Sequence, residues 1–337
     1  QQVIEEMFTW FEAQGGTSAT DLLLFANIPG INRGIPNGLK SPYADEATVG
    51  VTVRFGQNGT VRADYVHREA HDFYAVKVDQ TTGQVTDDFG NTLDYGDIVN
   101  HDDLLEHTYD GLHTQVSYRF SPRLTVGGTW TWSHLRGNWD GERVSGSDKW
   151  ASNIVKYPEY KDPSWNAPSG DLYGDRRHKV RAWTIWNAVS TRRHGLSISG
   201  LLNFLTGAPY SAVAEIDVSN FVENPGYATP AVLQDYFFSN RGEFRTDDIL
   251  SLDLAFNYTF TFPAVLNGLS IFVQPEIRNV LNSQGAAGHD NTVIVNPEEP
   301  FNPWTEAPVL GRNYELGENF GQPVSEFDYQ PPRTFLL

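Results

Sequence analysis

Apolar and polar residues alternate along much of the chain, and long polar stretches rich in Asp, Asn, Gly and Pro separate these segments. Alternation with a period of two, kept up over about ten residues, predicts β-strands that have one apolar face. We predict strands at 47–55, 60–74, 107–120, 123–135, 178–190, 196–206, 249–261 and 268–278, a further one near 2–12, and one that begins after Pro332.

The segment 250–261 illustrates the alternation. Its even-numbered residues, from Leu250 to Phe260, are Leu, Phe or Tyr, and its odd-numbered residues are Ser, Asp, Ala, Asn or Thr. Strands of globular proteins usually have about 5–6 residues, whereas a tilted strand that crosses a membrane needs about 9–11. The polar faces also carry charges, such as Arg54 and Asp64, which a wet lumen tolerates and a dry core does not. We therefore favour a membrane barrel over a soluble sandwich or jelly roll.

Two of the predicted strands fit this pattern less well. In 179–190, Trp183 and Ile185 share a face with Arg181, and in 196–205 both faces are partly apolar. Either apolar side chains face the lumen there and pack against a plug, or the register differs from the one inferred.

Connectors between the predicted strands alternate between short and long. The short ones are 56–59, 121–123, 191–195 and 262–268, and the long ones are roughly 75–106, 136–178, 207–248 and 279–331. The long stretches hold 30 of the 42 acidic residues and 11 of the 24 basic residues, so their net charge is −19 and the rest of the chain carries +1. Short periplasmic turns opposite long extracellular loops are typical of bacterial outer-membrane barrels.

Composition narrows the function classes. The formal net charge of −18 argues against nucleic acid as a partner, because phosphate binding needs clustered Lys and Arg. The absence of cysteine excludes disulfides, thiolate metal sites and thiol catalysis. The first residues predict no signal peptide, and no run of about 18 apolar residues predicts a membrane-spanning helix. A membrane role would therefore come through a β-barrel.

Several short sequence elements of the chain resemble those of a known protein family. RADYVHR follows a paired strand, TWSHLRGN ends a second hairpin, GDRRH and TGAPYS flank a third, and RNVLNSQ ends a late strand. Together these elements resemble TonB-dependent outer-membrane receptors of the Oar-like type, whose plug resembles a carboxypeptidase-regulatory domain. They occur in the family's order, at 41–74, 109–142, 174–189, 200–211, 270–284 and 320–335.

The resemblance implies a receptor that takes up a ligand with energy from the inner membrane, through a barrel of about 22 strands with a plugged lumen. We expect an all-β, antiparallel transmembrane meander of about ten strands, with 1–337 forming part of the receptor barrel and lacking the plug and the end of the last strand. The expected partners are outer-membrane lipid, an unknown extracellular ligand and, through an N-terminal part, an inner-membrane energy-coupling protein. A passive porin or an adhesion or structural barrel is the alternative.

Four sets of side chains are candidates for chemistry. The stretch Asn100–His107 places His101, Asp102, Asp103, Glu106 and His107 close together, as a metal site would, but we favour an acidic loop tip that runs into the strand at His107. Two pairs, His71–Asp72 and His289–Asp290, are the ones that an outer-membrane protease could use, although adjacent strand residues face opposite sides.

The GDRRH element concentrates Arg176, Arg177 and His178, which could bind an anion, and we favour local pairing with Asp171 and Asp175. Tryptophans in the loops could stack on a sugar or a peptide, but we favour a role in packing the loops against one another. These tryptophans are Trp139, Trp150, Trp165 and Trp304. We assign no catalytic, cofactor or metal residue, predict no cofactor and no enzymatic activity, and leave the ligand-binding residues unknown.

Overall fold

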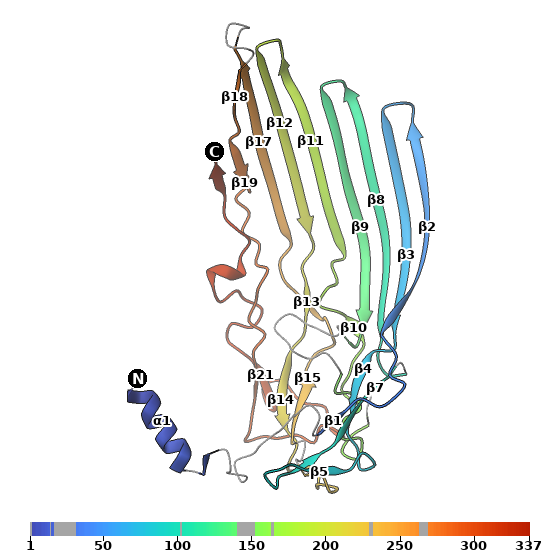
Figure 1. Ribbon diagram of the computed structural model, residues 1–337, viewed down its shortest axis with the longest axis vertical. Coiled ribbons are helices and arrows are strands. Elements are labelled where there is room, and N and C mark those ends of the chain that lie inside the picture. The colour runs from blue at the N-terminus through green and yellow to red at the C-terminus, as the bar shows by residue number, and fades with distance from the viewer. Residues whose placement is uncertain are drawn as a thin grey trace.

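The computed structural model describes most of the chain (Figure 1). The described residues are 2–13, 15–16, 32–101, 103–139, 152–162, 165–228, 232–262 and 269–337.

One large antiparallel sheet dominates the molecule, and its strands lie side by side in the order of the sequence. Each strand therefore pairs with the one before and the one after it, which is a meander. The sheet confirms the predicted antiparallel fold class. Its strands are β2 (Tyr43–Phe55), β3 (Gly59–His71), β8 (His107–Ser121), β9 (Leu124–Gly137), β11 (His178–Ser190), β12 (His194–Leu205), β17 (Ile249–Thr261), β19 (Glu276–Arg278) and β22 (Thr334–Leu336), with β10 (Gly170–Asp171) beside β9 and β18 (Ser270–Val273) beside β17.

Short turns join the long strands at one end of the sheet, and the long connectors gather at the other end (Figure 1). The predicted turn 262–268 lies almost entirely outside the described residues. The connectors form small sheets of their own: β1 (Arg33–Gly34) with β7 (Gly96–Asn100) and β4 (Tyr74–Lys77), β5 (Gln84–Thr86) with β6 (Thr92–Asp94), β13 (Pro209–Tyr210) with β16 (Phe244–Arg245), β14 (Val213–Asp217) with β15 (Leu233–Phe237), and β20 (Val293–Val295) with β21 (Tyr314–Leu316).

The register of the sheet sorts the side chains into an apolar and a polar face. Residues aligned across neighbouring strands point to the same side, and the next row along points to the other. One aligned row is apolar on each of the seven long strands from β2 to β17: Val53, Val61, Val116, Gly128, Ala182, Leu202 and Leu252. The adjacent row is polar on the same strands: Thr52, Arg62, Gln115, Thr129, Arg181, Asn203 and Ser251. The apolar face is the one that suits contact with lipid.

The two ambiguous strands keep the inferred register. Trp183 pairs with Gly127 on one side and with Leu201 on the other, so it lies on the polar face, as do Ile185 and Arg181. The partly apolar face of this pair of strands is therefore a patch on the polar face of the sheet.

The buried apolar residues of the described chain all lie in the connectors, between Phe73 and Phe301, and none lies in the long strands of the sheet. β2 is exposed along its whole length. A soluble sandwich would bury one face of these strands under a second sheet, so this alternative is wrong for the described residues. The hydrophobic core of the described residues therefore holds the connectors together.

Two details correct the predicted elements. The segment near 2–12 is not a strand but helix α1 (Gln2–Ala13), because its apolar residues recur at helical spacing, as in Met7, Trp10 and Phe11. The strand predicted at 268–278 is interrupted between β18 and β19, where Pro275 cannot donate a backbone hydrogen bond to the ladder. Within the described residues, no helix is long and apolar enough to cross a membrane.

Candidate functional site

At the loop end of the sheet, the described residues form a packed layer built around three apolar clusters. The first joins residues from the 75–106 connector to Tyr227 and to the tyrosines of the 136–178 connector, and the third joins the connectors 207–248 and 279–331. Segments far apart in the sequence therefore hold one another in place. The buried members are Val76, Val78, Ile98 and Tyr227 in the first cluster, Phe73, Ala75, Leu105 and Val155 in the second, and Ile216, Val218 and Phe301 in the third.

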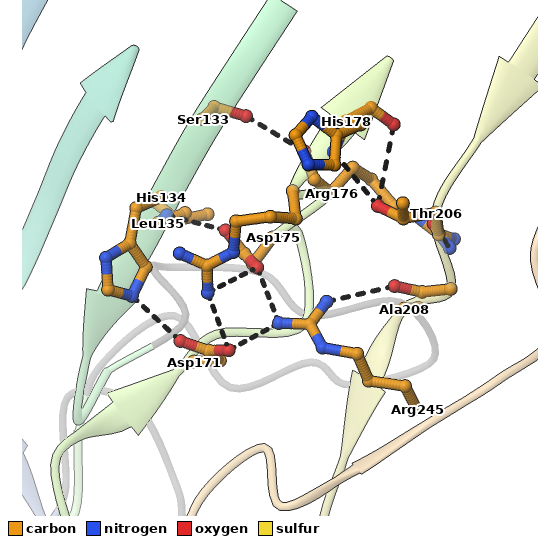
Figure 2. A network of polar contacts seen from close by, with 12 residues as sticks. Ser133, His134, Leu135, Asp171, Asp175, Arg176, His178, Thr206, Ala208 and Arg245 are labelled. Carbon is orange, nitrogen blue, oxygen red and sulfur yellow. Dashed lines mark hydrogen bonds and ion pairs between the residues drawn. The ribbon is translucent and has the colours of Figure 1, made fainter.

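An ion-pair network lies where this layer meets the strands (Figure 2). Arg245 Nη2 contacts Asp175 Oδ2 at 2.8 Å and also pairs with Asp171. Arg177 Nη2 lies 3.0 Å from Asp171 Oδ2 and 3.4 Å from Asp175 Oδ2. His134 on β9 adds a contact of 2.9 Å between its Nε2 and Asp171 Oδ1. The two carboxylates thus join β9, the entry to β11 and the connector that carries Arg245.

The contacts within this network favour the charged forms of Asp171 and Arg245. Partial burial alone would raise the pKa of Asp171, but His134, Arg177 and Arg245 outweigh it, and the pKa of Asp171 is lowered. Burial likewise opposes the charge of Arg245, yet hydrogen bonds to Asp175 and Asp171 raise its pKa. The side chain of Asp175 is completely buried, and it also accepts a hydrogen bond of 2.8 Å from the backbone N–H of Leu135. These groups form a structural junction.

The GDRRH residues separate into different roles. Arg177 pairs with Asp171 and Asp175, as predicted. Arg176 donates a hydrogen bond of 3.0 Å to the carbonyl oxygen of Thr206, and desolvation lowers its pKa. The backbone N–H of His178 donates to Thr206 Oγ1 at 3.0 Å, so this element ties β11 to the end of β12.

Sequence reasoning missed Arg245 and His134 as members of the network. Both are far from the motif in the sequence, and only the folded loops bring them to it. One signal was present: the acidic connector 207–248 contains only two basic residues, Arg241 and Arg245, and an isolated cation among acids is a candidate for an ion pair.

The described members of the metal candidate around Asn100–His107 do not gather as a set of metal ligands. The amide of Asn100 bonds to the backbone of Lys40 and to the carbonyl oxygen of Asp72. Glu106 accepts a hydrogen bond of 2.7 Å from Ser169 Oγ, and the ring of His107 packs edge-on against Phe73. Asp102 lies outside the described residues, and among the described ones no three His, Asp or Glu side chains are grouped as metal ligands would be.

Neither His–Asp pair forms a dyad. His71 Nε2 lies 3.8 Å from Asp45 Oδ2, whereas Asp72 Oδ1 lies 3.7 Å from Lys40 Nζ. The ring of His289 packs on Tyr210 with 3.8 Å between the centroids, and the carboxylate of Asp290 accepts from the N–H of Thr292 at 2.7 Å. In both pairs the carboxylate is held by another residue.

The described loop tryptophans pin the loops, as predicted. Trp165 stacks on Trp304 with 5.5 Å between the ring centroids, and its Nε1–H donates to the carbonyl oxygen of Pro303 at 3.2 Å. These contacts join the connectors 136–178 and 279–331. Trp139 packs against the second apolar cluster, and Trp150 lies outside the described residues.

An open pocket of about 550 Å³ lies between three of the long connectors. Its described lining offers hydrogen-bonding side chains beside aromatic ones, and the guanidinium of Arg241 contacts two of the lining residues, Phe237 and Pro168. The lining includes Asn166, Tyr236, Phe238, Ser239, Asn240 and Glu243.

The chain is similar in part to several solved outer-membrane proteins. The outer membrane transporter YddB from Escherichia coli is 17% identical, with a TM-score of 0.48, and the match covers 79% of this chain and 32% of that one. The FrpB iron transporter from Neisseria meningitidis is 14% identical, with a TM-score of 0.41, and the match covers 75% of this chain and 29% of that one. The ferric-catecholate import receptor Fiu from E. coli is 13% identical, with a TM-score of 0.40, and the match covers 88% of this chain and 27% of that one. The chain thus spans about a third or less of the length of these proteins.

No curated protein sequence matches the chain significantly. The family described as the outer membrane beta barrel domain matches residues 9–246, which is more than half of the sequence. This match agrees with the apolar and polar rows of the meander, and with short turns at one end of the sheet and acidic loops at the other. The chain belongs to the outer membrane beta barrel domain family and is a protein of the Gram-negative outer membrane.

Proposed function

We propose that this chain forms part of the barrel wall of a TonB-dependent receptor of the Oar-like type, which takes up an extracellular ligand across the outer membrane. The ordered elements RADYVHR, TWSHLRGN, GDRRH, TGAPYS and RNVLNSQ support the family assignment. The observation that supports a barrel with more strands than this sheet is the direction of the two edge strands of the meander.

The edge strands β2 and β22 run in the same direction. Eight successive antiparallel pairings lead from one to the other, so both run from the loop end to the turn end (Figure 1). Bacterial single-chain outer-membrane barrels are antiparallel and have an even number of strands. The nine strands that the described residues form cannot close in this way on their own, and an odd number of further strands would complete the barrel. A receptor barrel of about 22 strands meets this condition.

The polar face suits the lumen of such a barrel. Arg62 pairs with Asp64 at 2.7 Å, and Arg278 pairs with Glu276 at 2.9 Å, both on the face opposite the apolar rows. Charged pairs of this kind need water or a polar neighbour. Wide barrels with a channel or a plugged lumen supply one.

The loop layer is the surface that a ligand outside the cell meets first. Its open pocket presents amide, hydroxyl and carboxylate groups with aromatic rings. We propose no catalytic step, because the carboxylates of both His–Asp pairs are held by other residues. Energy for uptake would come from an inner-membrane coupling protein that contacts the part of the receptor which fills the lumen.

Uptake by the whole protein in intact cells tests the receptor function. A TonB-dependent receptor should concentrate its ligand, and an agent that collapses the inner-membrane proton gradient should abolish accumulation. A passive porin would equilibrate solutes whether or not the membrane is energised. An adhesion or structural barrel would show no uptake in either condition.

Hydrogen exchange tests the larger barrel independently of transport. β2 pairs only with β3 in the described sheet, so alternate backbone N–H groups of β2 face away from it. In the whole protein in lipid, all amides between Thr48 and Val53 should be protected, because hydrocarbon cannot satisfy open N–H groups. Fast exchange at alternate residues would contradict the larger barrel.

A further inference from the structure

The apolar face of the sheet is hollowed at one place. A shallow groove of about 380 Å³ crosses β3, β8, β9 and β11. Gly128 and Ala182, which are paired across β9 and β11, form its floor. The side chains that flank this floor on the same face are Val61, Thr114, Val116, Val126, Trp130 and Val180.

The shape of the groove is set by the residues that follow one another along β9. Val126, Gly128 and Trp130 follow one another on the same face of β9, so a residue without a side chain stands between two large ones. A Cβ added at Gly128 would lie 2.9 Å from the carbonyl oxygen of Arg181, which is too close for a larger residue without a shift of the backbone. The depression is therefore a permanent feature of this part of the wall.

One end of the groove points toward the loop side of the membrane. Trp130 forms the wall there, and its indole Nε1–H donates to Nδ1 of His178 at 3.3 Å while the two rings stack. His178 pairs with Trp132, on the same face and two rows nearer to the loops. Tryptophans in such positions mark the boundary between hydrocarbon and headgroups, so the groove runs from the hydrocarbon to the extracellular interface.

We propose that this groove seats one acyl chain of an outer-leaflet lipid. It is continuous with the apolar rows that face the membrane, so a lipid chain is the molecule that meets it. In hydrocarbon there is no hydrophobic drive for association, and retention depends on the fit of the contacts. A groove one side chain deep offers a chain contacts on three sides, whereas the surrounding wall offers them on one.

Filling the groove tests this proposal. We would purify the whole protein from outer membranes in mild detergent and count its bound lipids by native mass spectrometry. The wild type should retain one lipid through detergent exchange, and Ala182→Phe should lose it. Ile271→Phe is the matched control, because Ile271 lies on the same face, half exposed and far from the groove. This variant should retain the lipid.

Heat-modifiable gel mobility would show that each variant is folded, and Ala182→Ile supplies a smaller, strand-compatible filler if Ala182→Phe does not fold. A folded groove-filling variant that retains the lipid as the wild type does would overturn the proposal. A wild type that carries no lipid would also overturn it. So would a wild-type dimer that Ala182→Phe dissociates, since a second copy would then occupy the groove.

Discussion

The indole of Trp183 lies against the backbone of Gly127 on the neighbouring strand. A Cβ added at Gly127 would stand 2.2 Å from Cζ2 of Trp183, so only glycine fits beneath this ring. The two residues are register partners of β11 and β9 on the polar face of the sheet. An aromatic ring that covers a glycine on the next strand helps to fix register. This contact explains why an apolar residue interrupts the lumen face at this point.

Gly127→Ala should therefore destabilise the folded barrel, by about 1–3 kcal/mol, the usual cost of overpacking a close contact. Urea titration of the whole protein in lipid vesicles, read by heat-modifiable gel mobility, would measure the loss. Gly195→Ala is the matched control, because a Cβ there meets Thr259 at an ordinary 3.8 Å. The double variant Gly127→Ala/Trp183→Leu should recover much of the stability. Equal losses at Gly127 and Gly195 would count against a role for the indole.

Alternation made most of the sheet predictable. A membrane strand has one face in lipid and the other in a polar lumen, so its sequence has a clear period of two, as in 250–261. The same reasoning failed for 2–12, where apolar residues recur at positions such as Met7 and Phe11 and form a helix. Alternation could detect apolar residues on the lumen face, but it could not say that Gly127 makes room for Trp183.

The loop layer was less predictable, because its contacts join residues far apart in the sequence. The pairing of Arg177 with Asp171 could be predicted from the sequence, because the two residues are near neighbours in the chain. Arg245 and Asp175, which are in contact, lie 70 positions apart in the sequence, and no local sequence pattern predicts their contact. The open pocket depends in the same way on three connectors folding together. Loops gain their geometry from such long-range packing, whereas strands reveal theirs through local periodicity.

Asp175 should be the most sensitive carboxylate of the ion-pair network. Its side chain is fully buried, so Asp175→Asn would leave Arg177 and Arg245 poorly compensated, at a cost of about 2–4 kcal/mol. Hydrogen exchange across the connector 207–248 would report the loss as faster local opening. For comparison, Glu299→Gln removes an exposed ion pair with Arg312 and should cost about 0–1 kcal/mol. Similar effects of the two substitutions would argue against a structural role for the network.

Acid should open the turn that follows β4. Burial works against ionisation of Asp79, but hydrogen bonds from Thr81 and Thr82 and the ammonium group of Lys77 outweigh it and hold its pKa at about 2. A folded-state pKa below the usual 3.8 means that the ionised carboxylate stabilises the turn. This stabilisation is fully present above pH 4 and is lost as the pH falls toward 2.

The effect of acid can be measured as hydrogen-exchange protection of the Thr81 and Thr82 amides between pH 5 and 2, corrected for intrinsic exchange rates. Protection should fall across this window by an amount worth at most about 2 kcal/mol. Asp79→Asn should lower protection at neutral pH and remove the pH dependence. If the wild-type and Asp79→Asn profiles were parallel, the carboxylate would not be the group that titrates.

The two faces of β17 should respond differently to an added charge. Leu254 belongs to the apolar face, and its neighbour Ala255 lies on the polar face opposite Glu276. An arginine on the lipid face near the midplane costs about 2–4 kcal/mol, while one in the lumen meets water or polar groups. Leu254→Arg should therefore reduce folding into lipid vesicles far more than Ala255→Arg, whose guanidinium can reach Glu276.

Ala255 is a better partner for this comparison than Asp253, because Asp253 Oδ1 accepts a hydrogen bond of 2.8 Å from the backbone N–H of Asn279. Replacing Asp253 would remove that bond and mix two effects. Folding yield would be read as the fraction of heat-modifiable protein at a fixed lipid ratio, with the wild type alongside. If both arginine variants folded equally well, Leu254 would not face hydrocarbon. If Ala255→Arg were the worse of the two, the apolar and polar faces would have to be exchanged.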